Sequence, residues 1–136
     1  MKAPTQKVDT GALVAAARAV RQNAYAPYSE FLVGAAVLDE HGRIHAGCNV
    51  ENVSYGLTVC AERNAVAAAV AAGARRIRAV AVVSAARPPV TPCGACRQVL
   101  AELGDARTPV VIAGASGGRE KRLRLGALLP HAFKTF

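Results

Sequence analysis

Two short cysteine-containing segments constrain this chain more than any other feature of its 136 residues. Cys60-Ala61-Glu62 opens an alanine-rich helical stretch, and Pro92-Cys93-Gly94-Ala95-Cys96 opens a second helical stretch about 30 residues later. Between them, residues 77–84 form an apolar run typical of a buried strand. Helices and strands that alternate in this way predict a layered α/β domain with a mixed sheet.

The other predicted elements follow from apolar spacing and from turn residues. The chain contains no internal repeat, low-complexity tract or linker, so we expect one domain over residues 1–136. A hairpin should come first and parallel strands later. We expect helices over 9–23 (capped by Asp9 or Thr10), 60–72 (stopped by Gly73) and 93–103, strands over 31–38, 43–48, 77–84, 109–113 and 123–125, and a last helical turn at 126–129.

The composition is that of a globular protein, and the apolar runs indicate a compartment in which thiols stay reduced. With 52% hydrophobic and 19% charged residues it is not a disordered chain. No apolar run approaches the roughly 20 residues that cross a bilayer, so we expect no membrane partner. The first helical stretch contains Arg18 and Arg21, unlike the apolar centre of a signal peptide. We therefore expect a cytoplasmic protein whose four cysteines serve a metal or catalysis rather than disulfides.

The formal charge of +8 raises the question of nucleic acid. No arginine-rich block is interleaved with aromatic residues, as a stacking platform for bases would require. We therefore expect a solvated basic surface and no nucleic-acid partner, with nucleic-acid binding as the alternative. The basic residues are dispersed, as in Arg75, Arg76 and Arg78, or come late, as in Lys121, Arg122 and Arg124.

The spacing of the cysteines is that of an open zinc site. Three protein ligands leave one tetrahedral position for water, which a closed four-ligand site does not offer. Cys60 and Cys93 stand at helix starts, where free N–H groups and the helix dipole favour the thiolate. The Cys-x-x-Cys spacing brings Cys96 one turn along, onto the face of Cys93. Glu62, two residues past a ligand, can reach that water without binding the metal.

Three thiolates carry more negative charge than one Zn²⁺ neutralises, so the site needs a nearby cation. Arg63 follows Cys60 by three residues, and Arg97 directly follows Cys96. We favour Arg63 as the donor to a ligand sulfur because it shares a helical face with Cys60.

A structural zinc site or a redox pair is the alternative interpretation of a lone Cys-x-x-Cys. A structural site would need a fourth ligand, and Cys48 is most simply a small buried residue at a strand end. The Cys-Ala-Glu segment, the intervening strand and the proline before Cys93 together favour the open site. The candidate fourth ligands are Cys48, His41, His45 and His131.

Beyond these motifs, the chain resembles the small, homotetrameric, zinc-dependent class of cytidine deaminases. The resemblance runs from about Ala24 to Phe133. It implies a three-layer fold with a mixed sheet of about five strands flanked by helices, and one zinc ion per subunit. The segments that carry it are Ala26-Pro27-Tyr28-Ser29, residues 31–35, residues 47–52, Cys60-Ala61-Glu62-Arg63, residues 92–99 and Leu128-Leu129-Pro130 with Phe133.

The resemblance also implies the reaction, which is hydrolytic deamination of cytidine and 2′-deoxycytidine to uridine and 2′-deoxyuridine with release of ammonia, a step of pyrimidine salvage. Glu62 would move the protons. Asn49 and Glu51 would bind the ribose hydroxyls, Phe31 would pack against the pyrimidine, and the Ala61 backbone would help orient the base. The alternatives are turn formation and solvation for Asn49 and Glu51, and core packing for Phe31.

The family further implies a homotetramer in which neighbouring subunits complete each active site. Tyr55 and Phe133 lie in segments that would reach such contacts, with Phe133 as a lid over a neighbour's substrate. The alternative for Phe133 is an apolar anchor on its own subunit.

Three other functions compete with deamination of a free pyrimidine nucleoside. One is deamination of another small nucleoside, such as the antibiotic blasticidin S, against which Asn49-Val50-Glu51-Asn52 and Phe31 favour cytidine. Another is a nucleic-acid-editing or nucleic-acid-binding module, although Glu51 would repel a 3′-phosphate. The third is a purely structural zinc protein.

Overall fold

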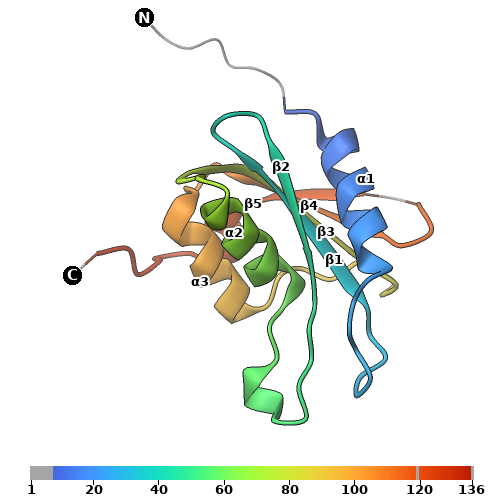
Figure 1. The fold of residues 1–136 in the computed structure, drawn as a ribbon. Coiled ribbons are helices and arrows are strands. Elements are labelled where there is room, and N and C mark those ends of the chain that lie inside the picture. Colours follow the sequence, from blue (N-terminus) through green and yellow to red (C-terminus); the bar gives the residue numbers. More distant parts are fainter. Residues whose placement is uncertain (1–7, 119, 136) are drawn as a thin grey trace, which may run out of the picture.

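The computed structural model describes residues 8–118 and 120–135, which form a five-stranded sheet between layers of helices (Figure 1). Helix α1 (Thr10–Arg21) covers one face of the sheet. Helices α2 (Ala61–Ala71) and α3 (Gly94–Leu103) lie side by side on the other face. None of the helices in the described ranges is long and apolar enough to cross a membrane. The three-layer α/β prediction is confirmed.

The sheet is mixed, with strand order β2-β1-β3-β4-β5. Strand β1 pairs antiparallel with β2 and with β3, β3 pairs parallel with β4, and β4 pairs antiparallel with the edge strand β5. The expected hairpin therefore comes first, and one parallel pair follows it. The strand bounds are β1 Val33–Asp39, β2 Ile44–Cys48, β3 Ile77–Ser84, β4 Pro109–Gly114 and β5 Lys121–Arg124; the short helices are η1 Tyr55–Leu57 and α4 Leu125–Leu128.

The strand predicted to begin at residue 31 begins instead at Val33. There the side-chain amide of Asn49 makes the hydrogen bonds to the backbone that a neighbouring strand would otherwise make. Its Nδ2 donates to the Phe31 carbonyl at 2.8 Å, and its Oδ1 accepts from Val33 N at 2.8 Å. The backbone around Phe31 thus pairs with a side chain rather than with a neighbouring strand.

The bounds of the last strand, predicted over 123–125, also differ in the structure. Strand β5 starts two residues earlier than expected because Lys121 pairs with Ile112, and Leu125 belongs to α4 rather than to the strand. At the N-terminus, Asp9 is the cap of α1, since its Oδ1 accepts from Ala12 N at 3.2 Å.

The β1–β2 turn is organised by Asp39, which is completely buried. Its carboxylate accepts hydrogen bonds from His41 N, Arg43 N, Arg43 Nε and His45 Nε2 at 2.7–2.9 Å. Burial by itself raises the pKa of Asp39, but these hydrogen bonds, led by that of His45, outweigh burial and hold the pKa below its ordinary value. His45 is therefore engaged in the turn rather than near the cysteines.

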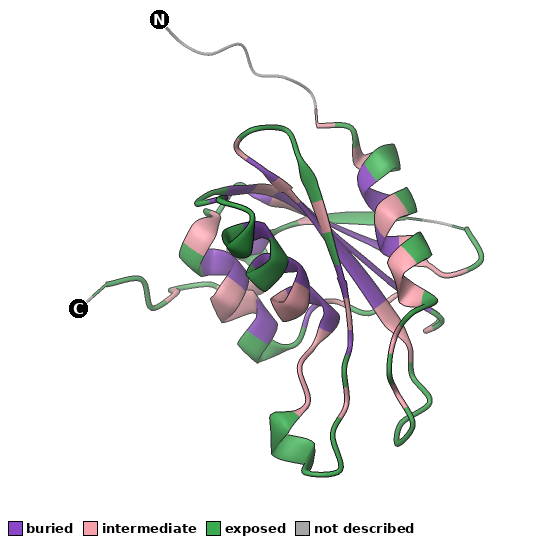
Figure 2. Cartoon of the chain, in the orientation of Figure 1, coloured by how far each residue is buried: buried purple, intermediate pink, exposed green. Residues whose placement is uncertain are grey.

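Two apolar clusters, one on each face of the sheet, make up the core (Figure 2). Alanine and valine dominate both clusters, and such small side chains let a helix approach the sheet closely. On the face covered by α2, the backbones come close at Gly47 in β2, where an added Cβ would lie 2.3 Å from Ala65 N and 2.8 Å from Ala61 O. Helix α2, with Cys60 at its N-cap, is therefore positioned directly by β2.

We expect Gly47→Ala to lower the free energy of unfolding by about 1–3 kcal/mol, because backbone atoms of α2 would have to move away. The same movement should shift Cys60 and reduce zinc content. Urea unfolding and metal analysis measure both effects. Gly56→Ala is the matched control, because nothing lies within 4 Å of its added Cβ. Equal stability and zinc content in the two variants would contradict the close-packing argument.

Candidate metal and substrate site

Three cysteines from two helix starts come together at one end of the sheet. Cys60 is the N-cap of α2, Cys93 is the N-cap of α3, and Cys96 lies in the first turn of α3. Their Sγ atoms all lie within 4.8 Å of one another, and those of Cys60 and Cys93 are 3.9 Å apart. Cys96 is buried whereas Cys93 is exposed, so the cluster opens to the surface on one side.

The cluster fits a zinc ion. Sulfur ligands about 2.3 Å from a tetrahedral zinc ion lie about 3.8 Å from one another, close to the observed Cys60–Cys93 separation. Within the described ranges, the metal-ligand cluster contains only Cys60, Cys93 and Cys96. The candidate fourth ligands of a structural site are thus not part of it. Three thiol ligands and an open side fit a zinc site that keeps a position for water.

The surroundings of Cys60 favour its thiolate. Hydrogen bonding with Cys96, which has the largest effect, acts together with the hydrogen bond of Cys93 and with the charge and hydrogen bond of Arg63. Against the opposing effect of burial, these contacts lower the pKa of Cys60 to about 6. The pKa of Cys96 is raised correspondingly by its hydrogen bond to Cys60 and by burial. A metal ion that binds all three sulfur atoms would displace the thiol protons that remain.

Glu62 lies beside the cluster, in the first turn of α2, with only 5% of its surface exposed. Burial raises the pKa of Glu62, and the negative charge of Cys60 raises it further. A carboxyl group whose pKa is raised in this way is suited both to take up and to return a proton. Ala61, completely buried, places its backbone between Cys60 and Glu62.

The structure separates the two candidate cations. Arg63 acts on Cys60 both through its charge and through a side-chain hydrogen bond. Arg97 faces elsewhere, since its guanidinium donates to Pro92 O at 2.7 Å, to Leu128 O at 2.8 Å and to Thr91 Oγ1 at 2.8 Å. Arg97 therefore fixes the loop before Cys93, while Arg63 is the cation beside a ligand sulfur.

The two predicted ribose-binding residues lie in one loop region and are both engaged in it. The Glu51 carboxylate accepts from Tyr28 N at 3.0 Å, from Ser29 N at 3.1 Å and from the Ser29 hydroxyl. The Ser29 hydroxyl makes the largest contribution to lowering the pKa of Glu51. Asn49 is buried and holds the backbone at Phe31 and Val33, as described above. Turn formation is thus part of what both residues do.

A hollow of about 350 Å³ lies beside Glu51. Tyr28, Ser29, Tyr55 and Thr58 complete its lining. The rings of Tyr28 and Tyr55 meet edge to face, with centroids 5.9 Å apart. Tyr55 is 75% exposed, so within this chain the hollow has an open apolar wall.

The two predicted aromatic contacts are both exposed. Phe31 is 40% exposed, so core packing does not explain it. Phe133 is 62% exposed, and its carbonyl accepts from Gln98 Nε2 at 2.8 Å, which ties the C-terminal segment to α3. Cys48 ends β2 as expected but is half-buried rather than buried.

Several residues that position the site were missed by sequence reasoning. Arg97 and Gln98 bind the backbone carbonyls of Leu128 and Phe133, and Ser29 binds the Glu51 carboxylate. These partners are distant in sequence, so no local pattern reveals the contacts. Asn64 belongs with them, because its Nδ2 donates to Cys48 O at 2.8 Å and holds α2 against β2. Only Arg97 carries a local signal, because it directly follows Cys96; that position predicts a charge beside the sulfur atoms, whereas the side chain holds the loop before Cys93.

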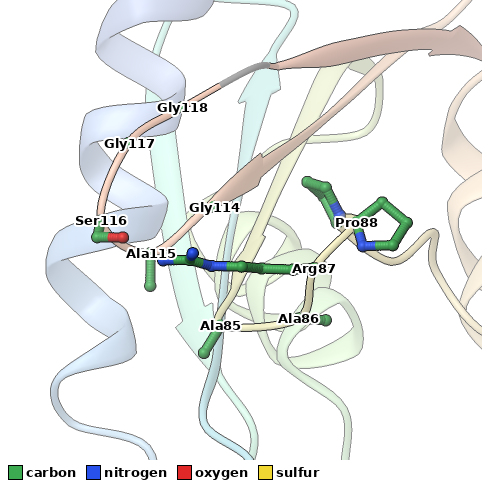
Figure 3. Close-up of a pocket in the computed structure, with 10 residues that line it drawn as sticks. Ala85, Ala86, Arg87, Pro88, Gly114, Ala115, Ser116, Gly117 and Gly118 are labelled. Atoms are coloured by element: carbon green, nitrogen blue, oxygen red, sulfur yellow. The ribbon is translucent and has the colours of Figure 1, made fainter.

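A second hollow, of about 470 Å³, lies where β3 and β4 end (Figure 3). Residues 85–89 and 114–118 line it, and Figure 3 shows the Arg87 side chain extending toward Ala115 and Ser116. Its lining contains neither a cysteine nor a carboxylate. The metal chemistry therefore belongs to the cysteine cluster and not to this hollow.

A layered α/β fold with three convergent cysteines and a neighbouring buried glutamate defines the zinc-dependent deaminases of nucleobases. The family model described as "Cytidine and deoxycytidylate deaminase zinc-binding region" matches residues 8–112. The chain therefore belongs to the cytidine and deoxycytidylate deaminase family.

Individual relatives agree with this assignment. The chain is 47% identical over 126 residues to a cytidine deaminase of Sporosarcina psychrophila, covering 93% of this chain and 92% of the relative. The crystal structure of a cytidine deaminase from Burkholderia pseudomallei superposes with a TM-score of 0.86 at 50% identity, covering 90% of this chain and 98% of that one. The structure of the Mycobacterium tuberculosis cytidine deaminase gives a TM-score of 0.83 at 44% identity, covering 95% and 100%.

We expect Arg63→Gln to weaken zinc retention, because the negative charge of the three thiolates would lose its nearest compensation. The loss should be about 10- to 100-fold in zinc affinity or in turnover, measured by chelator competition and by steady-state rates. Arg76→Gln, an exposed arginine elsewhere, is the charge-matched control. If Arg63→Gln kept the zinc content and the turnover rate of the wild type, the role assigned to Arg63 would be contradicted.

Proposed function

We propose that this chain, as a single deaminase domain over residues 1–136, hydrolyses cytidine and 2′-deoxycytidine to uridine and 2′-deoxyuridine with release of ammonia. One observation carries the proposal: three Sγ atoms within 4.8 Å of one another stand beside a nearly buried glutamate. Relatives at 44–50% identity that bear the name cytidine deaminase support the choice of substrate. The reaction fits pyrimidine salvage.

Cys60, Cys93 and Cys96 would hold one zinc ion per subunit. When bound, the ion supplies a Lewis acid that makes a water molecule acidic near neutral pH. The chain's own contribution is to pre-assemble the sulfur ligands at two helix starts, where N–H groups and the Arg63 charge stabilise thiolate.

Glu62 moves the protons in this proposal. It takes one proton from the attacking water, whose oxygen forms the new bond to C4 of the pyrimidine. The same proton goes to N3 as the oxygen attacks, which makes C4 electrophilic. Glu62 then takes the remaining proton from the new C4 hydroxyl group and delivers it to the departing amino group, so that the C4–N bond breaks, the C4=O bond forms and ammonia leaves. Its burial keeps bulk water away from these transfers.

The sugar would be recognised by Asn49 and Glu51. Asn49 keeps one N–H and one lone pair beyond the two backbone bonds it makes, and these can serve a ribose hydroxyl. Glu51 can exchange the Ser29 hydroxyl for that of a ribose, since both are neutral donors. Phe31 would pack against the pyrimidine, and the Ala61 backbone would orient the base. A 3′-phosphate would meet the Glu51 charge, which favours a free nucleoside over nucleic acid.

We also propose a homotetramer in which neighbouring subunits complete each active site. The loops around residues 25–31 and 50–58 expose many large apolar side chains, more than an isolated monomer ordinarily leaves uncovered. Tyr55 on this surface and Phe133 near the C-terminus would reach the substrate of a neighbouring subunit. The most exposed members of this apolar surface are Tyr25, Val53, Tyr55 and Leu57.

The free thiols that the metal requires favour a cytoplasmic location.

The reaction is tested by ultraviolet-monitored conversion of cytidine by the zinc-loaded protein. We expect uridine and ammonia in equal amounts, and a loss of about a thousandfold or more in Glu62→Gln with zinc content unchanged. Glu102→Gln, an exposed glutamate on α3, is the control. Untouched cytidine despite stoichiometric zinc would rule out this substrate, and substantial turnover in Glu62→Gln would rule out the assigned role.

Sugar recognition is tested by combining a variant with a modified substrate. We expect Glu51→Gln to lower kcat/KM for cytidine by roughly 10- to 100-fold, the effect of losing a hydrogen bond to a charged group. Removal of the 3′-hydroxyl from the substrate should lower the kcat/KM of the wild type by a similar factor. It should lower the kcat/KM of Glu51→Gln little further. Additive losses would show that Glu51 acts only through the loop that it organises. Glu30→Gln, exposed in the same loop, controls for charge.

Subunit sharing is tested by mixing two inactive variants. Sedimentation should give four times the 14.0 kDa chain, about 56 kDa. If Phe133 covers a neighbour's substrate, tetramers co-assembled from Phe133→Ala and Glu62→Gln chains should regain activity, because some sites then combine an intact Glu62 with an intact Phe133. A monomeric mass, or no regained activity in proven mixed tetramers, would contradict the proposal.

A further inference from the structure

The edge strand β5 carries a basic stripe that the deaminase site does not use. Its residues alternate, so that Leu123 packs against the core under α2 and α3 while Arg122 and Arg124 project to the opposite face. The register places Arg122 beside Val111 and Arg124 beside Pro109. Both arginines are exposed.

A third arginine joins them from the loop before β4. Arg107 lines a hollow of about 390 Å³ together with Pro109, Arg122, Leu123 and Arg124. None of these lining residues is acidic. The nearest carboxylate along the chain, Asp105, accepts from the backbone N–H of Arg107 at 2.7 Å and does not line this hollow.

Among the described residues, the three guanidinium groups have no charge partner. Within residues 8–118 and 120–135, the ion pairs are those of Asp39 with Arg43 and His45, and no hydrogen bond involves the guanidinium of Arg107, Arg122 or Arg124. Like charges that share one hollow repel each other, and a multiply charged anion would relieve that repulsion. This differs from Arg18, Arg21, Arg43 and Arg97, whose guanidiniums all bind backbone carbonyls.

The lining also defines the chemistry of a ligand. Guanidinium groups form paired hydrogen bonds with phosphate oxygens, and three groups can serve more than one phosphate. No aromatic residue lines the hollow, so it offers no surface on which a base could stack. Its volume falls in the range of small-molecule sites. The lining thus favours a compact di- or triphosphate group over a polynucleotide.

We propose that Arg107, Arg122 and Arg124 form a binding site for a small molecule that carries a di- or triphosphate group. The site is separate from the metal centre. Cys93 follows the carboxyl end of β3, whereas the arginines surround Pro109, at the amino end of the parallel strand β4. The length of the sheet therefore lies between the two sites, and a ligand here does not compete with the nucleoside.

Calorimetric titration of the zinc-loaded full chain with inorganic pyrophosphate tests the site. We expect one pyrophosphate per chain, affinity about tenfold weaker in Arg122→Gln, and no measurable binding in the Arg122→Gln/Arg124→Gln double variant. Arg87→Gln, which removes the same charge from another exposed arginine, should change affinity less than about twofold. Zinc content is measured after each titration because pyrophosphate also chelates zinc. Pyrophosphate should raise the Tm of the wild type but not that of the double variant.

Four results would overturn the proposal. The first is no pyrophosphate binding by the wild type, and the second is an equal loss of pyrophosphate affinity in Arg87→Gln and Arg122→Gln. The third is a heat of titration that varies with the amount of zinc lost and not with the arginine substitutions. The fourth is binding of an oligothymidylate without binding of pyrophosphate. A changed oligomeric mass of the double variant would instead make this face an interface between copies. Unfolding curves of the variants ensure that a lost signal is not a lost fold.

Discussion

The deaminase site depends on the convergence of two helix N-termini, which brings three sulfur atoms within 4.8 Å. Several thiolates repel one another, so the fold must supply positive potential where they meet. The free N–H groups at the starts of α2 and α3 contribute to it, and Arg63 adds a full positive charge beside Cys60. Everything that sets the relative position of these two helices therefore sets the metal site.

Small residues and buried side chains fix that position. Gly47 lets the backbone of α2 touch β2, and Asn64 locks the contact through the Cys48 carbonyl. On the other helix, Arg97 binds Pro92 O and Leu128 O, so the loop before Cys93 and the C-terminal segment are held by one side chain. Packing and hydrogen bonding remote from the reacting atoms thus decide the geometry of the sulfur ligands.

The loop region proposed to bind the sugar follows a different physical rule. Its polar residues are engaged with backbone groups, as Glu51 is with Tyr28 N and Ser29 N, while its aromatic side chains remain exposed. A loop held by hydrogen bonds and surrounded by uncovered apolar surface is suited to contact with another subunit. The proposed tetramer and the proposed nucleoside site would then share the same surface.

The sequence by itself determined the zinc ligands, the neighbouring glutamate and the alternation of helices and strands, because each rests on local spacing that a helix or strand fixes within a few residues. It did not determine that β1 starts at Val33, that Arg97 turns away from the sulfurs, or that Ser29 binds Glu51. Those features are contacts between segments distant along the chain, and only tertiary structure brings their partners together. The arginines of β5 belong to the same class, since neither their shared hollow nor their lack of a charge partner within the part of the chain that the structure describes can be seen until the sheet has formed.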